Sequence, residues 1–219
     1  MKVEQDQDLL DLTIVIPTYN RAHILNLSLS ELSKVELIER ARIIIADNGS
    51  HDTTHEVVHK HSLHSLKHIR YIKEKRVGCS FAKNRGWNEC ETKYLVYLDD
   101  DCFPHKLFLM NCEKWISQKC IIVSGKCERW SALTPEWVED EFFIENPPQD
   151  TVHRFSNSNF VKGGVMLVEL SVFSEIGGFD PNLGMQGERV FYGEDSLFAD
   201  RALRANIEVF YDPALVIYH

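Results

Sequence analysis

Residues 94–101 read YLVYLDDD, an apolar segment that ends in three consecutive aspartates. The apolar part, residues 94–98, is typical of a strand buried on both faces of a sheet. Asp99, Asp100 and Asp101 follow where that strand leaves the sheet, and ligands of open α/β sheets collect beyond the carboxyl ends of the strands. Because adjacent carboxylates repel one another, the triplet suits Mg²⁺ or Mn²⁺ shared with phosphates. The alternative is an acidic surface turn that caps a following helix.

The composition is that of a globular domain. The chain has 219 residues, 44% hydrophobic and 26% charged, and a net charge of −9 without any Lys/Arg block, which argues against a nucleic-acid partner. The amino-terminal residues lack the apolar core of a signal peptide, and no apolar run is long enough to cross a membrane. We therefore expect a cytoplasmic protein, with peripheral membrane contact left open. The six cysteines form no CxxC pair and are expected to be reduced thiols.

Strand and helix signals alternate along the chain, which predicts a single α/β domain with a mainly parallel central sheet flanked by helices. The segment between residues 125 and 160 has little periodicity and is expected to be irregular. The predicted strands cover residues 12–16, 42–46, 69–72, 94–98, 120–124, 165–168, 209–211 and 215–218. The predicted helices cover residues 22–35, 52–66, 80–89, 104–119, a segment beginning near 170, and 194–204.

Polar motifs follow the first two predicted strands. PTYNR at 17–21 either ends a strand and begins a helix or forms a shelf for a nucleobase. DNGS at 47–50 favours a tight turn. Asp47, like Asp99, stands at the carboxyl end of a strand, where it can accept hydrogen bonds from a base or a ribose. If the strands are neighbours, both motifs open into one crevice.

Two further motifs open predicted helices. In GCSFAKNRG at 78–86, small residues permit close approach of an anion, and Lys83 or Arg85 is either a phosphate ligand or a surface cation. In Gly-Glu-Asp at 193–195, the acids either complement the helix dipole or supply a general base. His219 follows an apolar run and is either a metal ligand or simply exposed.

Histidines gather between residues 51 and 68, and His51, His55 and His59 have the spacing of one helical face. No other motif points to that segment. We therefore interpret these histidines as a solvent-exposed helix face instead of a metal centre.

Taken together and in order, these motifs resemble the GT-A-fold, inverting, nucleotide-sugar-dependent glycosyltransferases of family 2. The resemblance covers essentially the whole chain. The matching text is TIVIPTYNR at 13–21, ADNGS at 46–50, GCSFAKNRGW at 78–87, YLVYLDDDC at 94–102, GGVMLVE at 163–169, IGGFD at 176–180, YGEDSLFADRA at 192–202 and DPALVIYH at 212–219.

The resemblance implies a role for each matching position. A half that binds the nucleotide sugar would cover about residues 1–124, and a half that binds the acceptor and carries the base would cover about 125–219. The donor would be bound by Pro17, Thr18, Tyr19, Arg21, Asp47, Asn48, Lys83, Asn84, Asp99 and Asp100. The Mn²⁺ or Mg²⁺ ion would be held by Asp101 with Asp99 and His219. Asp195 would be the catalytic base, and the acceptor side would include Trp137, Gly163, Gly164 and Glu194.

One departure concerns the usual Ala-Arg-Asn of the third motif, which here reads Ala82-Lys83-Asn84. Lysine keeps the positive charge but lacks the bidentate fork of arginine. The contact between Lys83 and a phosphate is therefore open.

The reaction that the resemblance implies is transfer of a hexosyl or N-acetylhexosaminyl group to a hydroxyl of a glycan or other acceptor. UDP is the favoured nucleotide, guanine and deoxythymidine donors stay open, and polysaccharide biosynthesis is the expected setting. A sugar-phosphate nucleotidyltransferase is one alternative, although it should carry a glycine-rich loop where this chain has PTYNR. A catalytically silent scaffold is the other, although it would not need Asp47, Asp99, Asp101 and Asp195 together.

Overall fold

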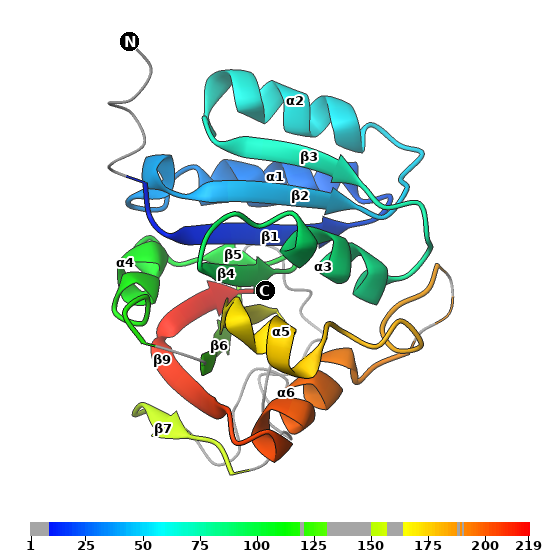
Figure 1. Cartoon of the computed structure of the whole chain (residues 1–219). Coiled ribbons are helices and arrows are strands. Elements are labelled where there is room, and N and C mark those ends of the chain that lie inside the picture. The colour runs from blue at the N-terminus through cyan, green and yellow to red at the C-terminus, as the bar shows by residue number, and fades with distance from the viewer. Residues whose placement is uncertain (1–8, 119–120, 131–149, 157–163, 188, 190) are drawn as a thin grey trace.

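Strands and helices alternate along most of the chain (Figure 1). The computed structural model describes residues 9–118, 121–130, 150–156, 164–187, 189 and 191–219. The strands are β1 (Leu12–Thr18), β2 (Arg42–Asp47), β3 (Ile69–Lys73), β4 (Tyr94–Leu98), β5 (Phe103–Pro104), β6 (Ile121–Glu128), β7 (His153–Arg154), β8 (Val165–Glu169) and β9 (Glu208–Tyr218). The helices are α1 (Ala22–Leu32), the 3-10 turn η1 (Ile38–Arg40), α2 (Thr54–His64), α3 (Cys79–Asn88), α4 (Phe108–Glu113), α5 (Ser171–Ile176) and α6 (Glu194–Arg204).

The strands form one sheet in the order β3-β2-β1-β4-β8-β6-β9-β5, with β7 paired to β9. The first four strands are mutually parallel, as helical crossovers require. β8 then lies antiparallel to both β4 and β6, and β9 is parallel to β6. The predicted α/β class is confirmed, and the sheet is mixed because its second half departs from the parallel pattern.

Helices cover both faces of this sheet (Figure 1). Along β1, Leu12, Ile14 and Ile16 pack in a cluster that includes buried side chains of α1, α2 and α4. Val15 points the other way, into a second cluster built with α3, α5 and α6. Burying each such side chain contributes roughly 1.5–3 kcal/mol. Strands buried on both faces are therefore apolar throughout, which is the pattern read in residues 94–98.

The predicted helix over residues 104–119 is wrong at both ends. Pro104 lies in β5, where it pairs with Ile217 of β9, and α4 covers only Phe108–Glu113. After α4 the chain turns, so that the buried Trp115 donates a hydrogen bond from Nε1 to Asp212 at 2.8 Å. Pairing and burial with distant β9 thus override the local helical periodicity.

The two predicted closing strands, residues 209–211 and 215–218, are parts of one continuous strand, β9. Its register against β6 shifts between Gly125, which pairs with Asp212, and Lys126, which pairs with Val216. A side chain at Gly125 would collide with the carbonyl oxygen of Leu215, so glycine permits this irregularity. β6 also extends the regular structure to Glu128, and β7 adds a short strand inside the segment expected to be irregular.

The described cysteines, at 79, 90, 102, 112 and 127, carry thiols and not disulfides, and Cys120 lies outside the described residues. Within the described ranges, no helix is long and apolar enough to cross a membrane.

Gly86 lets α3 lie close against β1. A Cβ atom at this buried position would overlap Cγ1 of Val15, a stiff side chain with no exposure. Helix α3 is therefore fixed at a short distance from the sheet, which matters because its first turns face the candidate site.

Gly86→Ala should destabilise the protein although alanine favours helices by about 1 kcal/mol over glycine. We expect the free energy of unfolding to fall by about 1–3 kcal/mol, the usual cost of overpacking a core. Urea denaturation measures the change. Gly86→Ala should cost less stability in a Val15→Ala background than in the wild-type protein, because the shorter side chain removes the overlap. An equal cost in the two backgrounds would contradict the close packing.

Candidate active site

One cavity of about 590 Å³ opens at the carboxyl ends of the parallel strands. Its walls come from the end of β1 and the segments after β1, β2 and β4, from the first turns of α3 and α6, from Met185, Gly187 and residues 191–193, and from Gly164 and His219. The predicted site residues that line it are Pro17, Thr18, Tyr19, Arg21, Asn48, Lys83, Asp99, Asp100, Asp101, Gly164, Glu194, Asp195 and His219. The topology thus brings together motifs that are up to about 200 positions apart in the 219-residue chain.

Asp100 ties the segment after β4 to the segment after β1. Its carboxylate accepts a hydrogen bond from Thr18 Oγ1 at 2.6 Å and pairs with Arg21 at 2.7 Å. Burial raises the pKa of Asp100 to about 7, although Arg21 and Thr18 oppose the shift. Both oxygens of this carboxylate are therefore engaged by the protein itself.

Asp101 is the more accessible member of the triplet. Its Oδ2 lies 2.6 Å from Arg21 and 3.4 Å from Nε2 of His219. Burial opposes ionisation, but the contacts with His219 and Arg21 outweigh it and lower the pKa of Asp101 to about 2. The hydrogen bond with Asp101 raises the pKa of His219, so a cationic imidazole and an anionic carboxylate stabilise each other.

Asp99 and Asp101 fit a hard divalent cation. Their carboxylate oxygens lie, with the thiol sulfur of Cys102, within 4.8 Å of one another. Burial raises the pKa of Cys102 well above its ordinary value, so this thiol stays protonated and is a poor ligand beside carboxylate oxygens. A Cβ at Gly164 would lie 3.1 Å from Sγ of Cys102 and 3.2 Å from Cδ1 of Ile217, so glycine avoids two tight contacts beside these carboxylates.

Glu194 and Asp195 begin α6 on the opposite wall, after Gly193 in a left-handed conformation with φ of 100°. Lys83 of α3 reaches both acids, at 2.7 Å from Oδ1 of Asp195 and 3.1 Å from Oε1 of Glu194. Burial raises the pKa of Asp195 to about 6, against the effect of Lys83. This carboxyl group is therefore ionised near neutrality, yet more basic than an ordinary aspartate.

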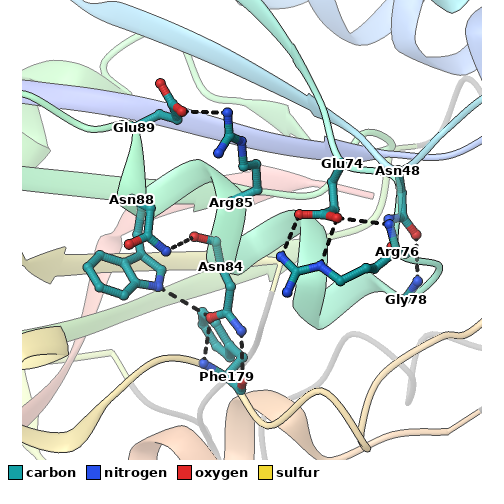
Figure 2. A network of polar contacts seen from close by, with 10 residues as sticks. Asn48, Glu74, Arg76, Gly78, Asn84, Arg85, Asn88, Glu89 and Phe179 are labelled. Carbon is teal, nitrogen blue, oxygen red and sulfur yellow. Dashed lines mark hydrogen bonds and ion pairs between the residues drawn. The ribbon is translucent and has the colours of Figure 1, made fainter.

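Asp47 and Asn84 do not line the cavity in the described structure. Asp47 is 1% exposed, accepts from the backbone N–H of Ser50 at 2.9 Å and is hydrogen-bonded to the hydroxyl of Tyr71. Asn84 donates to the carbonyl of Phe179 and accepts from its N–H, each at 2.8 Å (Figure 2). Both side chains hold the walls of the cavity in place.

Trp137 and Gly163, expected near the acceptor, lie outside the described residues. Cavity residues that sequence reasoning missed include Met185, Phe191 and Tyr192, which are 44%, 45% and 78% exposed. Exposed apolar side chains at the mouth of a polar cavity indicate a binding surface. The only signal for them in the sequence is their position just before Gly193-Glu194-Asp195.

Comparison with known families decides what kind of protein carries this arrangement. The model of "Glycosyl transferase family 2" matches residues 13–177, which is more than half of the 219-residue chain. The chain belongs to glycosyl transferase family 2. The predicted family resemblance is confirmed.

Two curated proteins have sequences similar to that of this chain. Chondroitin synthase from Escherichia coli is 35% identical over 102 residues, which are 46% of this chain and 15% of that protein. Validoxylamine A glucosyltransferase from Streptomyces hygroscopicus subsp. jinggangensis is 26% identical over 152 residues, 67% of this chain and 36% of that protein. This chain thus spans a minor part of the length of either relative.

Solved structures confirm the predicted GT-A fold of this family 2 chain. A mannosyltransferase from Pyrobaculum calidifontis, in complex with GDP-Man and Mn²⁺, has a TM-score of 0.72 at 18% identity. The match covers 98% of this chain and 58% of the mannosyltransferase chain. Staphylococcus aureus TarS 1-349, in complex with UDP-GlcNAc, has a TM-score of 0.72 at 16% identity. The match covers 96% of this chain and 58% of the TarS chain.

Thr18→Val should destabilise the site because Asp100, only 4% exposed, loses a hydrogen-bond donor. We expect the free energy of unfolding to fall by about 1–3 kcal/mol, the cost of an under-satisfied buried polar group. Thr18→Ser keeps the hydroxyl and is the matched control. Urea denaturation at pH 7 compares the three proteins, and a valine variant as stable as the serine variant would contradict a structural role for this hydrogen bond.

Proposed function

We propose that this chain transfers a sugar from a nucleotide sugar to an acceptor hydroxyl, with inversion at the anomeric carbon. The observation that carries the proposal is that one cavity holds both the aspartates at the end of β4 and Asp195, whose pKa is raised. Membership of family 2 supports this function over a sugar-phosphate nucleotidyltransferase or a silent scaffold. The two related structures, bound to GDP-Man with Mn²⁺ and to UDP-GlcNAc, support a nucleotide-sugar donor.

Asp101 is the proposed principal metal ligand, with Asp99 and His219 beside it. Mn²⁺ or Mg²⁺ held there would neutralise the charge that develops on the departing diphosphate. Arg21 already neutralises Asp100 and Asp101 in the described structure. It is therefore placed to exchange the contact with Asp101 for one with the donor.

The nucleoside end of the donor is proposed to lie against Pro17, Thr18, Tyr19 and Asn48, on the cavity wall formed after β1 and β2. UDP is the nucleotide we favour. Asp47 and Asn84 would act on the donor indirectly because their polar atoms bind the protein's own loops. The loop after β1 is held to the loop after β2 by a 2.8 Å hydrogen bond from the N–H of Asn20 to Ser50 Oγ.

Asp195 is the proposed general base. The acceptor oxygen would form its bond to the anomeric carbon as the bond from that carbon to the diphosphate oxygen breaks, and the hydroxyl proton would pass to the Asp195 carboxylate. The elevated pKa of Asp195 suits this step, since a base works best when its pKa lies near the operating pH. Glu194 lies beside it and would hydrogen-bond the acceptor.

The acceptor is proposed to be a glycan whose terminal ring rests on Phe191 and Tyr192. A pyranose has an apolar C–H face that suits an aromatic ring and hydroxyls that suit the carboxylates of Glu194 and Asp195. Gly164 also lines this cavity and is proposed to lie near the acceptor. A panel of UDP- and GDP-sugars with simple glycoside acceptors, followed by release of the nucleoside diphosphate, tests the proposed function.

Nucleotide binding should depend on a divalent cation held by Asp101. A ligand of the folded state raises its stability by mass action, so UDP with Mn²⁺ should raise Tm more than UDP with a chelator. Asp101→Asn should abolish the difference. Asp200→Asn, on the surface of α6 beside Arg204, is the control and should respond like wild type. Equal Tm shifts with and without metal in the wild-type protein would rule the metal dependence out.

Asp195→Asn should lower kcat by about 10²–10⁴-fold, because asparagine keeps the shape but cannot accept the proton. Affinity for UDP and Mn²⁺ should stay unchanged. In the wild-type protein, kcat/KM should be high above pH 6 and fall as the pH drops through about 6, where Asp195 becomes protonated. A variant that keeps more than about a tenth of wild-type kcat would remove Asp195 from the base role.

A further inference from the structure

Lys83 is an ammonium group enclosed by the protein. Its side chain is 2% exposed, and its Nζ pairs with Asp195 at 2.7 Å and Glu194 at 3.1 Å. The face of the Phe179 ring lies 5.2 Å from the same nitrogen. A buried charge costs several kcal/mol unless it is paired, so the two carboxylates are what make this position tenable.

The backbone that carries Lys83 is fixed from several sides. The hydroxyl of Tyr97 donates to the carbonyl of Lys83 at 3.0 Å. One residue on, Asn84 binds both polar backbone groups of Phe179, and at the start of α3 the N–H of Gly78 donates to Asn48 Oδ1 at 2.7 Å (Figure 2). The lysine stem therefore rises from a rigid base toward α6.

An ammonium group has three N–H donors and no acceptor. The two carboxylates of α6 use two of those donors, and because the Lys83 side chain is only 2% exposed, a diphosphate could reach the third donor only if Lys83 or α6 moved. Breaking a buried ion pair by removing one partner is strongly destabilising, because it leaves an uncompensated buried charge. The described geometry thus favours the carboxylates over a phosphate as the partner of Lys83.

We propose that Lys83 is a positioning residue that orients the carboxylate of Asp195, and that it does not bind the donor diphosphate. This inference rests on the proposed role of Asp195 as general base. The family resemblance placed Lys83, the cation of Ala82-Lys83-Asn84, on the donor. The inference assigns this cation to Asp195 instead.

Charges around Asp195 come from every wall of the cavity. Glu194 of α6 and Asp99 after β4 act with burial to raise the pKa of Asp195, and Lys83 opposes them. The thiol of Cys79 and the phenol of Tyr97 also face Lys83, and burial keeps both protonated by raising their pKa values. Lys83 is therefore the cation that keeps Asp195 ionised among these groups.

Lys83→Met tests the proposal. We expect kcat to fall by about 10–10²-fold at pH 7, less than the loss on removing the base itself, and the acid limb of the pH profile to move to higher pH. The Kd for UDP with Mn²⁺, measured by calorimetry, should stay within about twofold of wild type. Lys83→Arg should recover part of kcat. Lys60→Met, on the exposed face of α2, is the matched control.

A double variant keeps the test decisive if Lys83→Met alone does not fold. Lys83→Met combined with Asp195→Asn removes one charge of each sign, so no uncompensated carboxylate is created at position 195. If Lys83 acts through Asp195, the double variant should have the kcat and the UDP affinity of Asp195→Asn alone.

A loss of UDP affinity of more than about tenfold on removing Lys83, in either background, would overturn the proposal and return Lys83 to the diphosphate. A full further loss of kcat in the Asp195→Asn background would also overturn it. Failure of the proposed base gives a different result, because the single variant Asp195→Asn, with Lys83 in place, would then keep its activity.

Discussion

The repulsion among five carboxylates that face one cavity is the constraint on which the site depends. Two cations from distant elements relieve it. Arg21, after β1, neutralises Asp100 and Asp101, and Lys83, in α3, neutralises Asp195 and its neighbour. The cluster therefore joins the start of α6 to α3 and to the ends of β1 and β4. Asp100, Asp101, Glu194 and Asp195 can lie close together in the cavity because each is within hydrogen-bond distance of Arg21 or Lys83.

The cavity walls after the parallel strands could be predicted from the sequence because their signals are local. An apolar strand that ends in Asp99, or a helix that opens with small residues, shows its character within about ten positions. The partners of Lys83 could not be predicted in this way. Asp195 lies 112 positions away, and only the packing of α6 against the sheet brings it to α3. Aromatic Tyr192 was missed because a single exposed aromatic in an irregular segment carries no periodic signal.

The fold likewise has a part that local sequence signals predict and a part that depends on distant contacts. The parallel strands and their helices follow from hydrophobic periodicity, since each βαβ unit is nearly self-contained. The region around β5 and β9 does not, because Pro104 belongs to a strand only through its pairing with Ile217. Local periodicity favoured a helix there, and the buried contact between Trp115 and Asp212 replaced it with a turn. Tertiary pairing decides structure where local signals are ambiguous.

The most direct test is an experimental structure of the protein with Mn²⁺ and UDP bound. The account predicts Mn²⁺ on the carboxylate of Asp101, with the diphosphate on the metal. It also predicts that Lys83 Nζ stays within hydrogen-bond distance of Asp195, about 2.7–3.2 Å. Mn²⁺ bound away from Asp101, or Lys83 turned from Asp195 onto the diphosphate, would contradict it.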